Sequence, residues 1–175
     1  MELFANQPDA LKIVDPVLGD NGDFYDENFK TLLPHLKLLI AKADIITPNV
    51  TEAQILSGTT SSDPNQLLLD LKKYEAKNIV LTGIIEGGSI NNYLLAEDGS
   101  VHVSSGKYVN SVIHGAGDMF GSSMIAAIIN GKNLSEAQDF ATEITSEASA
   151  ITIKDKGFEK KGILFEPLLN KYTNL

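Results

Sequence analysis

Short runs of aliphatic and β-branched residues alternate along the chain with segments whose apolar residues recur at helical spacing. Residues 11–14, 44–46 and 78–81 predict strands, and residues 29–41 and 67–76 predict helices between them. This order is typical of βαβ units and of a mainly parallel sheet. Because the apolar runs are continuous, we expect helices on both faces of the sheet, in a three-layer αβα architecture.

The pattern changes after Thr82, where glycines become frequent. Residues 89–96 and 101–103 predict short antiparallel strands joined by a turn at residues 97–99. Helical spacing returns from Gly117 to Ile129, and a second helix opens at Leu134 after a break at residues 130–131. No repeat or linker marks a boundary, so we predict a single α/β domain over residues 1–175.

Composition excludes several classes of protein. The 175 residues are 43% hydrophobic and carry a net charge of −9, and every one of the 14 basic residues is lysine. We therefore expect no general affinity for nucleic acid or anionic membranes. The chain has no cysteine, which excludes disulfides and fits a cytoplasmic setting. The apolar run at residues 119–129 is too short to span a bilayer.

A glycine-rich segment opens the helix that begins near Gly117. Gly115, Ala116, Gly117 and Asp118 follow His114 directly. Two glycines let backbone amides converge, and a helix N-terminus favours negative charge, so an anion fits this loop. The alternative is structural, because a carboxylate in the first turn, such as Asp118, also serves as an ordinary helix cap.

Polar residues follow each of the first three predicted strands. They are Asp15 after the first, Thr47, Asn49 and Glu52 after the second, and Thr82 after the third. Ligands of open α/β sheets collect at the carboxyl ends of strands, so these side chains are expected on one face. The alternative for Asp15 is turn formation, because Asp-Pro and Asn-Gly are common in turns, but the two acids Asp15 and Asp20 beside a glycine turn favour a functional role slightly.

Asn49 and Glu52 have two interpretations. Three residues apart at a helix start, they match a capping box, which spacing alone favours. Alternatively, both face a cleft and hold Mg²⁺ through water, since Mg²⁺ prefers oxygen ligands. The three histidines, His35, His102 and His114, lack the spacing of a zinc site.

Taken in order, these motifs resemble the pyridoxal kinase family of the ribokinase-like superfamily. The resemblance runs from about residue 11 to about residue 153, and its motifs are Asp15-Pro16-Val17-Leu18-Gly19-Asp20-Asn21-Gly22, Thr47-Pro48-Asn49-Val50-Thr51-Glu52, Thr82-Gly83 and Gly115-Ala116-Gly117-Asp118. It implies ATP-dependent, Mg²⁺-dependent phosphorylation of the 5′-hydroxyl of a B6 vitamer, which is pyridoxal, pyridoxine or pyridoxamine.

The resemblance also implies roles for individual residues. Asp118 matches the catalytic base, and the amides of Gly115, Ala116 and Gly117 match an anion hole for the transferred phosphoryl group. Glu52 and Asn49 match a magnesium motif. The positions that match nucleotide contacts are Asp15, Thr47, Thr82, Ser105, Lys107 and Tyr108. Without arginine, charge neutralisation falls to Mg²⁺, backbone amides and a lysine such as Lys107.

The sequence departs from the family pattern in two places, at Ala116 and at its N-terminal end. Ala116 stands where many relatives carry threonine, a change that backbone-only contacts tolerate. Family members also begin with a further portion, which holds the first strands and much of the vitamin pocket. We therefore expect the C-terminal, nucleotide-binding part of a kinase, with residues 1–9 as the tail of a helix, and an exposed sheet edge that favours self-association.

Three alternatives stay open. Hydroxymethylpyrimidine kinases also resemble the chain at Asp15-Pro16-Val17 and Thr47-Pro48-Asn49, but that family typically carries cysteine where Asp118 stands. A non-catalytic nucleotide-binding fragment predicts Mg-ATP binding without turnover. A structural α/β module with capping boxes and glycine turns predicts no nucleotide binding at all.

Overall fold

The computed structural model describes residues 4, 6–7, 9–173 and 175. A five-stranded mixed sheet has the order β1-β4-β5-β6-β7, and its strands are β1 (Ile13–Val14), β4 (Ile45–Ile46), β5 (Asn78–Glu86), β6 (Ser89–Leu95) and β7 (Val101–Lys107). β1, β4 and β5 are parallel neighbours, with Ile13 opposite Ile45 and Ile45 opposite Asn78. The short connections from β5 to β6 and from β6 to β7 are compatible only with antiparallel pairing. The predicted mixture of parallel and antiparallel strands is confirmed.

The chain falls into two compact units. Unit 1 is Met1–Ile84 with Tyr93–His102, and unit 2 is Ile85–Asn92 with Val103–Leu175. The prediction of one domain over residues 1–175 stays a prediction beside this division. Residues 1–3, 5 and 8, part of the predicted helix tail, lie outside the described residues.

Unit 1 joins β1, β4 and the first part of β5 to three helices, α2 (Phe29–Ile40), α3 (Val50–Ser57) and α4 (Pro64–Lys72). Its core consists of fully buried aliphatic side chains that include Ile40, Ile46, Leu67 and Leu81. The continuous apolar strands and the apolar stripes of these helices meet in this core, as the sequence pattern predicts.

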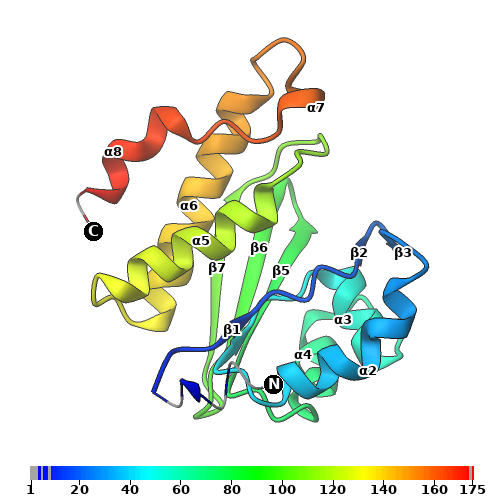
Figure 1. The fold of residues 1–175 in the computed structure, drawn as a ribbon. Helices are drawn as coiled ribbons and strands as arrows, with labels where there is room; N and C mark the ends of the chain where they lie inside the picture. Colours follow the sequence, from blue (N-terminus) through cyan, green and yellow to red (C-terminus); the bar gives the residue numbers. More distant parts are fainter. Residues whose placement is uncertain (1–3, 5, 8, 174) are drawn as a thin grey trace. The chain divides into compact units, whose positions relative to one another are not determined.

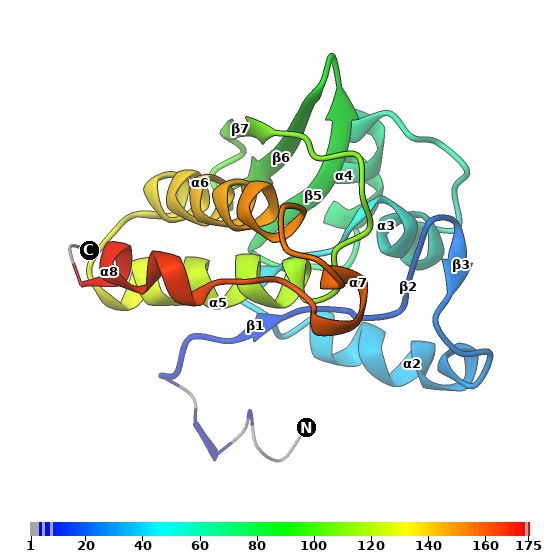
Figure 2. The ribbon, with the colours of Figure 1, turned by 90° about the horizontal axis from the view of Figure 1, so that it is seen from above.

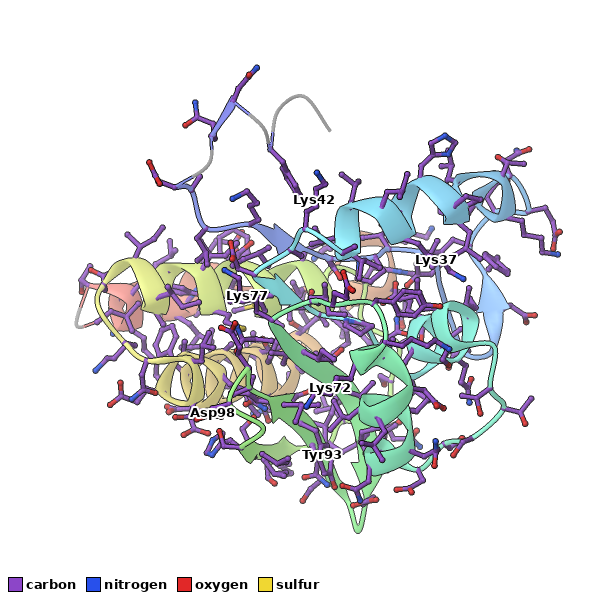
Figure 3. The ribbon with its side chains drawn as sticks, turned by 90° about the horizontal axis from the view of Figure 1, so that it is seen from below. Lys37, Lys42, Lys72, Lys77, Tyr93 and Asp98 are labelled. Carbon is purple, nitrogen blue, oxygen red and sulfur yellow. The ribbon has the colours of Figure 1, made fainter. Side chains whose placement is uncertain are left out.

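Asp44 fixes the register of the parallel strands in unit 1. Its Oδ2 accepts the backbone N–H of Lys12 at 2.9 Å, and its Oδ1 accepts the ammonium of Lys77 at 2.7 Å. Lys77 is labelled in Figure 3. Burial alone would raise the pKa of Asp44, but the bonds from Lys77 and Lys12 hold this pKa below its usual value. One carboxylate thus ties together the starts of β1, β4 and β5.

A two-stranded antiparallel hairpin, β2 (Gly19–Asp20) and β3 (Asp23–Phe24), follows β1. Gly19 has no room for a side chain, because an added Cβ would lie 2.1 Å from the carbonyl oxygen of Asp23. Val17, just before the hairpin, has a φ of 45°, which is a strained value for a β-branched residue. The sequence predicted only a turn here.

Unit 2 is built around the antiparallel pair α5 (Ala116–Ile129) and α6 (Leu134–Thr152), which lie side by side in Figures 1 and 2. Met119, Ile144, Ala148 and Leu168 form its buried apolar cluster. At Gly106 in β7, an added Cβ would lie 2.8 Å from the Cβ of Ser146, so this glycine lets β7 approach α6 closely.

Several element boundaries differ from the sequence prediction. α4 begins at Pro64 rather than residue 67 and ends at Lys72 rather than residue 76, because Asp63 caps the helix and Pro64 occupies its first turn. Three short helices after α6 were not predicted: α7 (Phe158–Lys161), η1 (Glu166–Leu168) and α8 (Leu169–Tyr172). In the described part of the chain, no helix has the length and apolar character needed to cross a membrane.

Candidate functional site

The polar residues predicted to follow the strands of unit 1 lie together in the structure. Thr47 follows β4 and donates its hydroxyl to Asp15 Oδ1 at 3.2 Å. Thr82 was predicted to follow the third strand, but it lies within β5, because this strand continues to Glu86. It donates its backbone N–H to the carbonyl of Pro48 at 2.9 Å and forms an isolated parallel bridge with Asn49. Asp15, Thr47, Asn49, Glu52 and Thr82 are together called the acidic cluster below.

Glu52 is the most buried charged residue of the acidic cluster, at 3% exposure. Its Oε1 accepts the backbone N–H of Leu18 and its Oε2 accepts the backbone N–H of Asn49, both at 2.9 Å. Burial, together with the neighbouring charge of Asp15, raises the pKa of Glu52 to about 7, against the lowering effect of the backbone donors. A cation near the two carboxylates would relieve both effects.

Asn49 forms the predicted capping box at the start of α3. Its Oδ1 accepts the backbone N–H of Glu52 at 2.9 Å, and its Nδ2 donates to the carbonyl of Gly19 at 2.9 Å. The amide oxygen is therefore engaged in the cap. Each oxygen of Glu52 also accepts one backbone N–H, so it is negative charge that distinguishes the carboxylates of Glu52 and Asp15 as oxygen donors for Mg²⁺.

Among the described residues, no three His, Cys, Asp or Glu side chains form a group that could hold a metal ion. Two carboxylates nevertheless suit Mg²⁺, which commonly keeps several waters. The role of Asn49 and Glu52 as a magnesium motif stays a prediction.

The glycine loop of unit 2 opens directly onto α5, as predicted. Gly115 is the N-cap residue with a φ of 85°, a conformation that favours glycine. Ala116, Gly117 and Asp118 form the first turn, whose amides have no acceptor within the helix. Asp118 is exposed. The Ala116 N–H donates to the Ile113 carbonyl at 3.4 Å, so the loop combines the N–H groups of Gly117 and Asp118 with a solvent-accessible carboxylate.

A cavity of about 540 Å³ lies beside this loop in unit 2. One wall is the face of α5 that carries Asp118, Met119 and Ser122, together with His114 and Gly115. The other wall is the C-terminal segment, with Lys161, Gly162, Ile163, Phe165, Leu169 and Tyr172. Sequence reasoning missed this second wall, because short helices and loops carry little periodic signal.

Two of the residues aligned loosely with the nucleotide loop line another cavity of unit 2. Ser105 and Lys107, at the end of β7, border a space of about 520 Å³ against α6. Ser105 donates to Asn91 Oδ1 at 2.7 Å. Tyr108 does not line this cavity, and its hydroxyl donates to Asn110 Oδ1 at 3.3 Å.

A second Asn-x-x-Glu sequence occurs at the start of α6. Asn133 and Glu136 form a complete capping box with the same pattern of reciprocal bonds as Asn49 and Glu52. Glu136 is exposed, whereas Glu52 is buried beside Asp15. The spacing alone therefore does not distinguish the two sites, but burial and the second carboxylate do.

Comparison with known proteins identifies related kinases. A family model described as phosphomethylpyrimidine kinase matches residues 2–161. A hydroxymethylpyrimidine/phosphomethylpyrimidine kinase of Bacillus subtilis is 34% identical over 81% of this chain and 54% of its own length. A pyridoxal kinase of Pasteurella multocida is 28% identical over 89% of this chain and 57% of its own length.

A solved structure shares the fold. The crystal structure of pyridoxal kinase from Lactobacillus plantarum superposes with a TM-score of 0.83 and 27% identity, over 93% of this chain and 60% of the other. The expected ribokinase-like αβα fold class is thus confirmed. The chain spans about half the length of the relatives that it matches.

Proposed function

Because the chain belongs to the phosphomethylpyrimidine kinase family, we propose that it is the nucleotide-binding part of a small-molecule kinase. This kinase transfers the γ-phosphoryl group of ATP to the 5′-hydroxyl of pyridoxal, pyridoxine or pyridoxamine. The observation that carries the proposal is the exposed carboxylate of Asp118, in the first turn of a helix that opens on a glycine loop and borders a cavity.

Asp118 acts as the general base. Its carboxylate takes the proton of the acceptor hydroxyl while that oxygen forms a bond to the γ-phosphorus, and the bond between this phosphorus and the β,γ-bridging oxygen breaks to release ADP. A base in this role needs solvent or substrate access, which the exposure of Asp118 provides.

The first-turn amides of α5 stabilise the charge on the transferred group. The left-handed conformation of Gly115 turns the chain into the helix, so that the N–H groups of Gly117 and Asp118 face no carbonyl of their own helix and can meet an anion, while the Ala116 N–H makes a long bond of 3.4 Å to the Ile113 carbonyl. Only backbone atoms take part, which is why alanine at position 116 is compatible with this role.

The acidic cluster of unit 1 is the proposed Mg²⁺ site. Mg²⁺ would neutralise phosphate charge, a task that otherwise falls to backbone amides and lysines in this arginine-free chain. Glu52 is held by two backbone donors, and Asp15 is oriented by the Thr47 hydroxyl. Both carboxylates are therefore positioned before any ion arrives.

Hydroxymethylpyrimidine is the second candidate acceptor, and the higher identity to the Bacillus subtilis enzyme supports it. Aspartate at position 118 supports the B6 vitamers instead, because the hydroxymethylpyrimidine kinases that the chain resembles typically carry cysteine there. Relative kcat/KM for pyridoxine and hydroxymethylpyrimidine, measured on the same preparation, decides between the two alcohols.

The test is ATP-dependent phosphorylation of pyridoxal by the 175-residue chain with Mg²⁺, beside an Asp118→Asn variant and an Asp70→Asn control. Asp70 lies on α4, outside both groups of candidate residues. We expect turnover that Asp118→Asn abolishes and Asp70→Asn preserves. Mg-ATP binding without turnover would identify a non-catalytic nucleotide-binding fragment. The absence of any nucleotide binding would support the third alternative, a structural α/β module.

Self-association is also part of the proposal. β1 stands at one end of the strand order, and edge strands readily pair with other chains. Light scattering on the purified chain should report a mass above that of one copy, and a monodisperse monomer would contradict this expectation.

A further inference from the structure

The cavity beside Asp118 has a wall that the roles proposed above do not use. This wall is the C-terminal segment Gly162 to Tyr172, which approaches the glycine loop at one end and α5 at the other. This folded segment presents large apolar side chains to the cavity.

The C-terminal segment is anchored at both ends. At one end, Ile163 donates its backbone N–H to the carbonyl of His114 at 2.9 Å. An added Cβ on Gly162 would lie 3.1 Å from this same carbonyl oxygen, so the approach to the glycine loop is close. Leu164 adds a bond from its backbone N–H to Thr152 Oγ1 at 2.9 Å.

At the other end, Tyr172 fixes the segment to α5. The Ser123 hydroxyl lies 2.7 Å from the Met119 carbonyl, to which it donates, and 2.7 Å from the Tyr172 hydroxyl. Because the serine proton is used in the first bond, Tyr172 donates in the second. The Tyr172 ring also packs edge to face on Phe140, with ring centroids 5.4 Å apart.

Between these anchors, two large apolar side chains stay accessible on the cavity wall. Phe165 is 43% exposed and Leu169 is 51% exposed, although the intervening Leu168 is buried in the core of unit 2. Apolar side chains held in place around a cavity are the usual lining of small-molecule sites, with a few polar groups that set orientation. Here Asp118 is such a group.

The chemistry of the cavity selects one class of ligand. A base must reach the proton that it removes, so the alcohol that Asp118 deprotonates has to enter the space that this carboxylate borders. Asp118 favours a ligand that brings a hydroxyl donor to its carboxylate, and the ammonium of Lys161 is already paired with Asp155 at 2.6 Å. A flat, uncharged aromatic ring with a hydroxymethyl group fits these walls.

We propose that the C-terminal segment forms the apolar wall of the acceptor pocket, and that Phe165 and Leu169 select an aromatic alcohol by packing on its ring. This inference rests on the proposed function, because it takes Asp118 as the base. It adds a specificity-determining element from a part of the chain for which the sequence motifs gave no role.

The experiment compares Leu169→Ala with Leu38→Ala. Leu38 is a matched control, since it is 55% exposed on α2 of unit 1 and lines neither cavity. We expect Leu169→Ala to raise the KM for pyridoxine about tenfold, with kcat and the KM for Mg-ATP unchanged. Leu169→Met, which keeps the apolar volume, should restore the KM, and Leu38→Ala should change nothing.

Each other outcome has a distinct meaning. If phosphorylation proceeds and Leu169→Ala changes neither KM, or raises only the KM for Mg-ATP, the inference is overturned and the proposed function stands. If the wild-type chain gives no turnover, equilibrium dialysis with pyridoxine and with Mg-ADP replaces the kinetics. Pyridoxine binding weakened by Leu169→Ala then supports the pocket, whereas Mg-ADP binding without any pyridoxine binding overturns it.

Discussion

The two units hold their candidate acids in opposite ways. In unit 1, Glu52 is 3% exposed, and both of its carboxylate oxygens accept backbone N–H groups. In unit 2, Asp118 is exposed in the first turn of α5, beside a cavity. One acid is thus part of the folded framework, and the other is available to a substrate.

A substitution therefore has different consequences at the two acids. A substitution of Glu52 removes hydrogen bonds within the fold, so it changes stability and ligand binding together, and a loss of activity does not separate the two. Removing an exposed group changes chemistry alone. Matched pairs of variants separate effects on stability from effects on chemistry.

The largest expected effect is on catalysis at Asp118. Asp118→Asn should lower phosphoryl transfer by roughly 10²- to 10⁴-fold, because general-base catalysis typically contributes that much. The free energy of unfolding should change by less than about 0.5 kcal/mol, since exposed positions have small effects. Steady-state kinetics and urea denaturation on the same samples measure both. A large loss of stability would contradict the contrast between the units.

The next effect is a dependence of stability on pH through Glu52. Its pKa of about 7 in the folded chain stands above the ordinary 4.5, so between pH 4.5 and 7 the folded state binds more protons than the unfolded state. Without Mg²⁺, stability should therefore fall by roughly 3 kcal/mol as the pH rises through this window.

Urea denaturation at several pH values measures this slope. Glu52→Gln should remove it, whereas Glu136→Gln, in the exposed capping box, should keep it. A wild-type chain whose stability rises with pH between 4.5 and 7, after correction with the Glu52→Gln variant, would show that the backbone donors dominate over burial at Glu52.

A smaller effect is expected at the glycines of the loop. Gly115 has a φ of 85°, so Gly115→Ala should cost about 1–2 kcal/mol of stability through backbone strain. Gly117 is helical and an added Cβ meets no atom within 4 Å, so Gly117→Ala should stabilise by about 0.5–1 kcal/mol. Thermal denaturation of the two variants tests this opposition, and equal shifts would argue against the described loop conformation.

The smallest difference compares the two capping boxes. Asn133→Ala removes one cap and should cost about 1 kcal/mol. Asn49→Ala also removes the bond from Asn49 Nδ2 to the Gly19 carbonyl and should cost about 1 kcal/mol more. Denaturant midpoints measure both changes. Identical costs would mean that the hairpin gains nothing from Asn49.

Much of the fold follows from sequence patterns, for reasons visible in particular elements. The continuous apolar runs became β1, β4 and β5, because each is buried in the core that helices cover. The capping box of Asn49 and Glu52 was found from spacing, since reciprocal bonds require that separation. These features depend on neighbours along the chain.

Features that depend on distant neighbours were missed. The hairpin β2–β3 consists of two-residue strands, and its attachment relies on a bond from the Gly22 backbone N–H to the Thr51 hydroxyl, 29 residues away. The burial of Glu52 likewise depends on Leu18, 34 residues distant. The start of α4 is different, because it depends only on its own residues. Asp63 as the cap and Pro64 in the first turn indicate a helix that begins at Pro64 rather than at residue 67.

Val17 offers a starting point for protein engineering. A β-branched side chain in the left-handed region lowers the stability of the folded chain, and glycine or asparagine would remove this strain. Because the Val17 side chain is half exposed, its replacement would lose little packing. Val17→Gly or Val17→Asn should therefore raise the melting temperature of the chain, and neither substitution replaces a candidate acid. Val17 directly precedes Leu18, whose backbone N–H donates to Glu52. A Val17 variant that is more stable but less active would indicate that the chain gives up stability to position the Glu52 carboxylate.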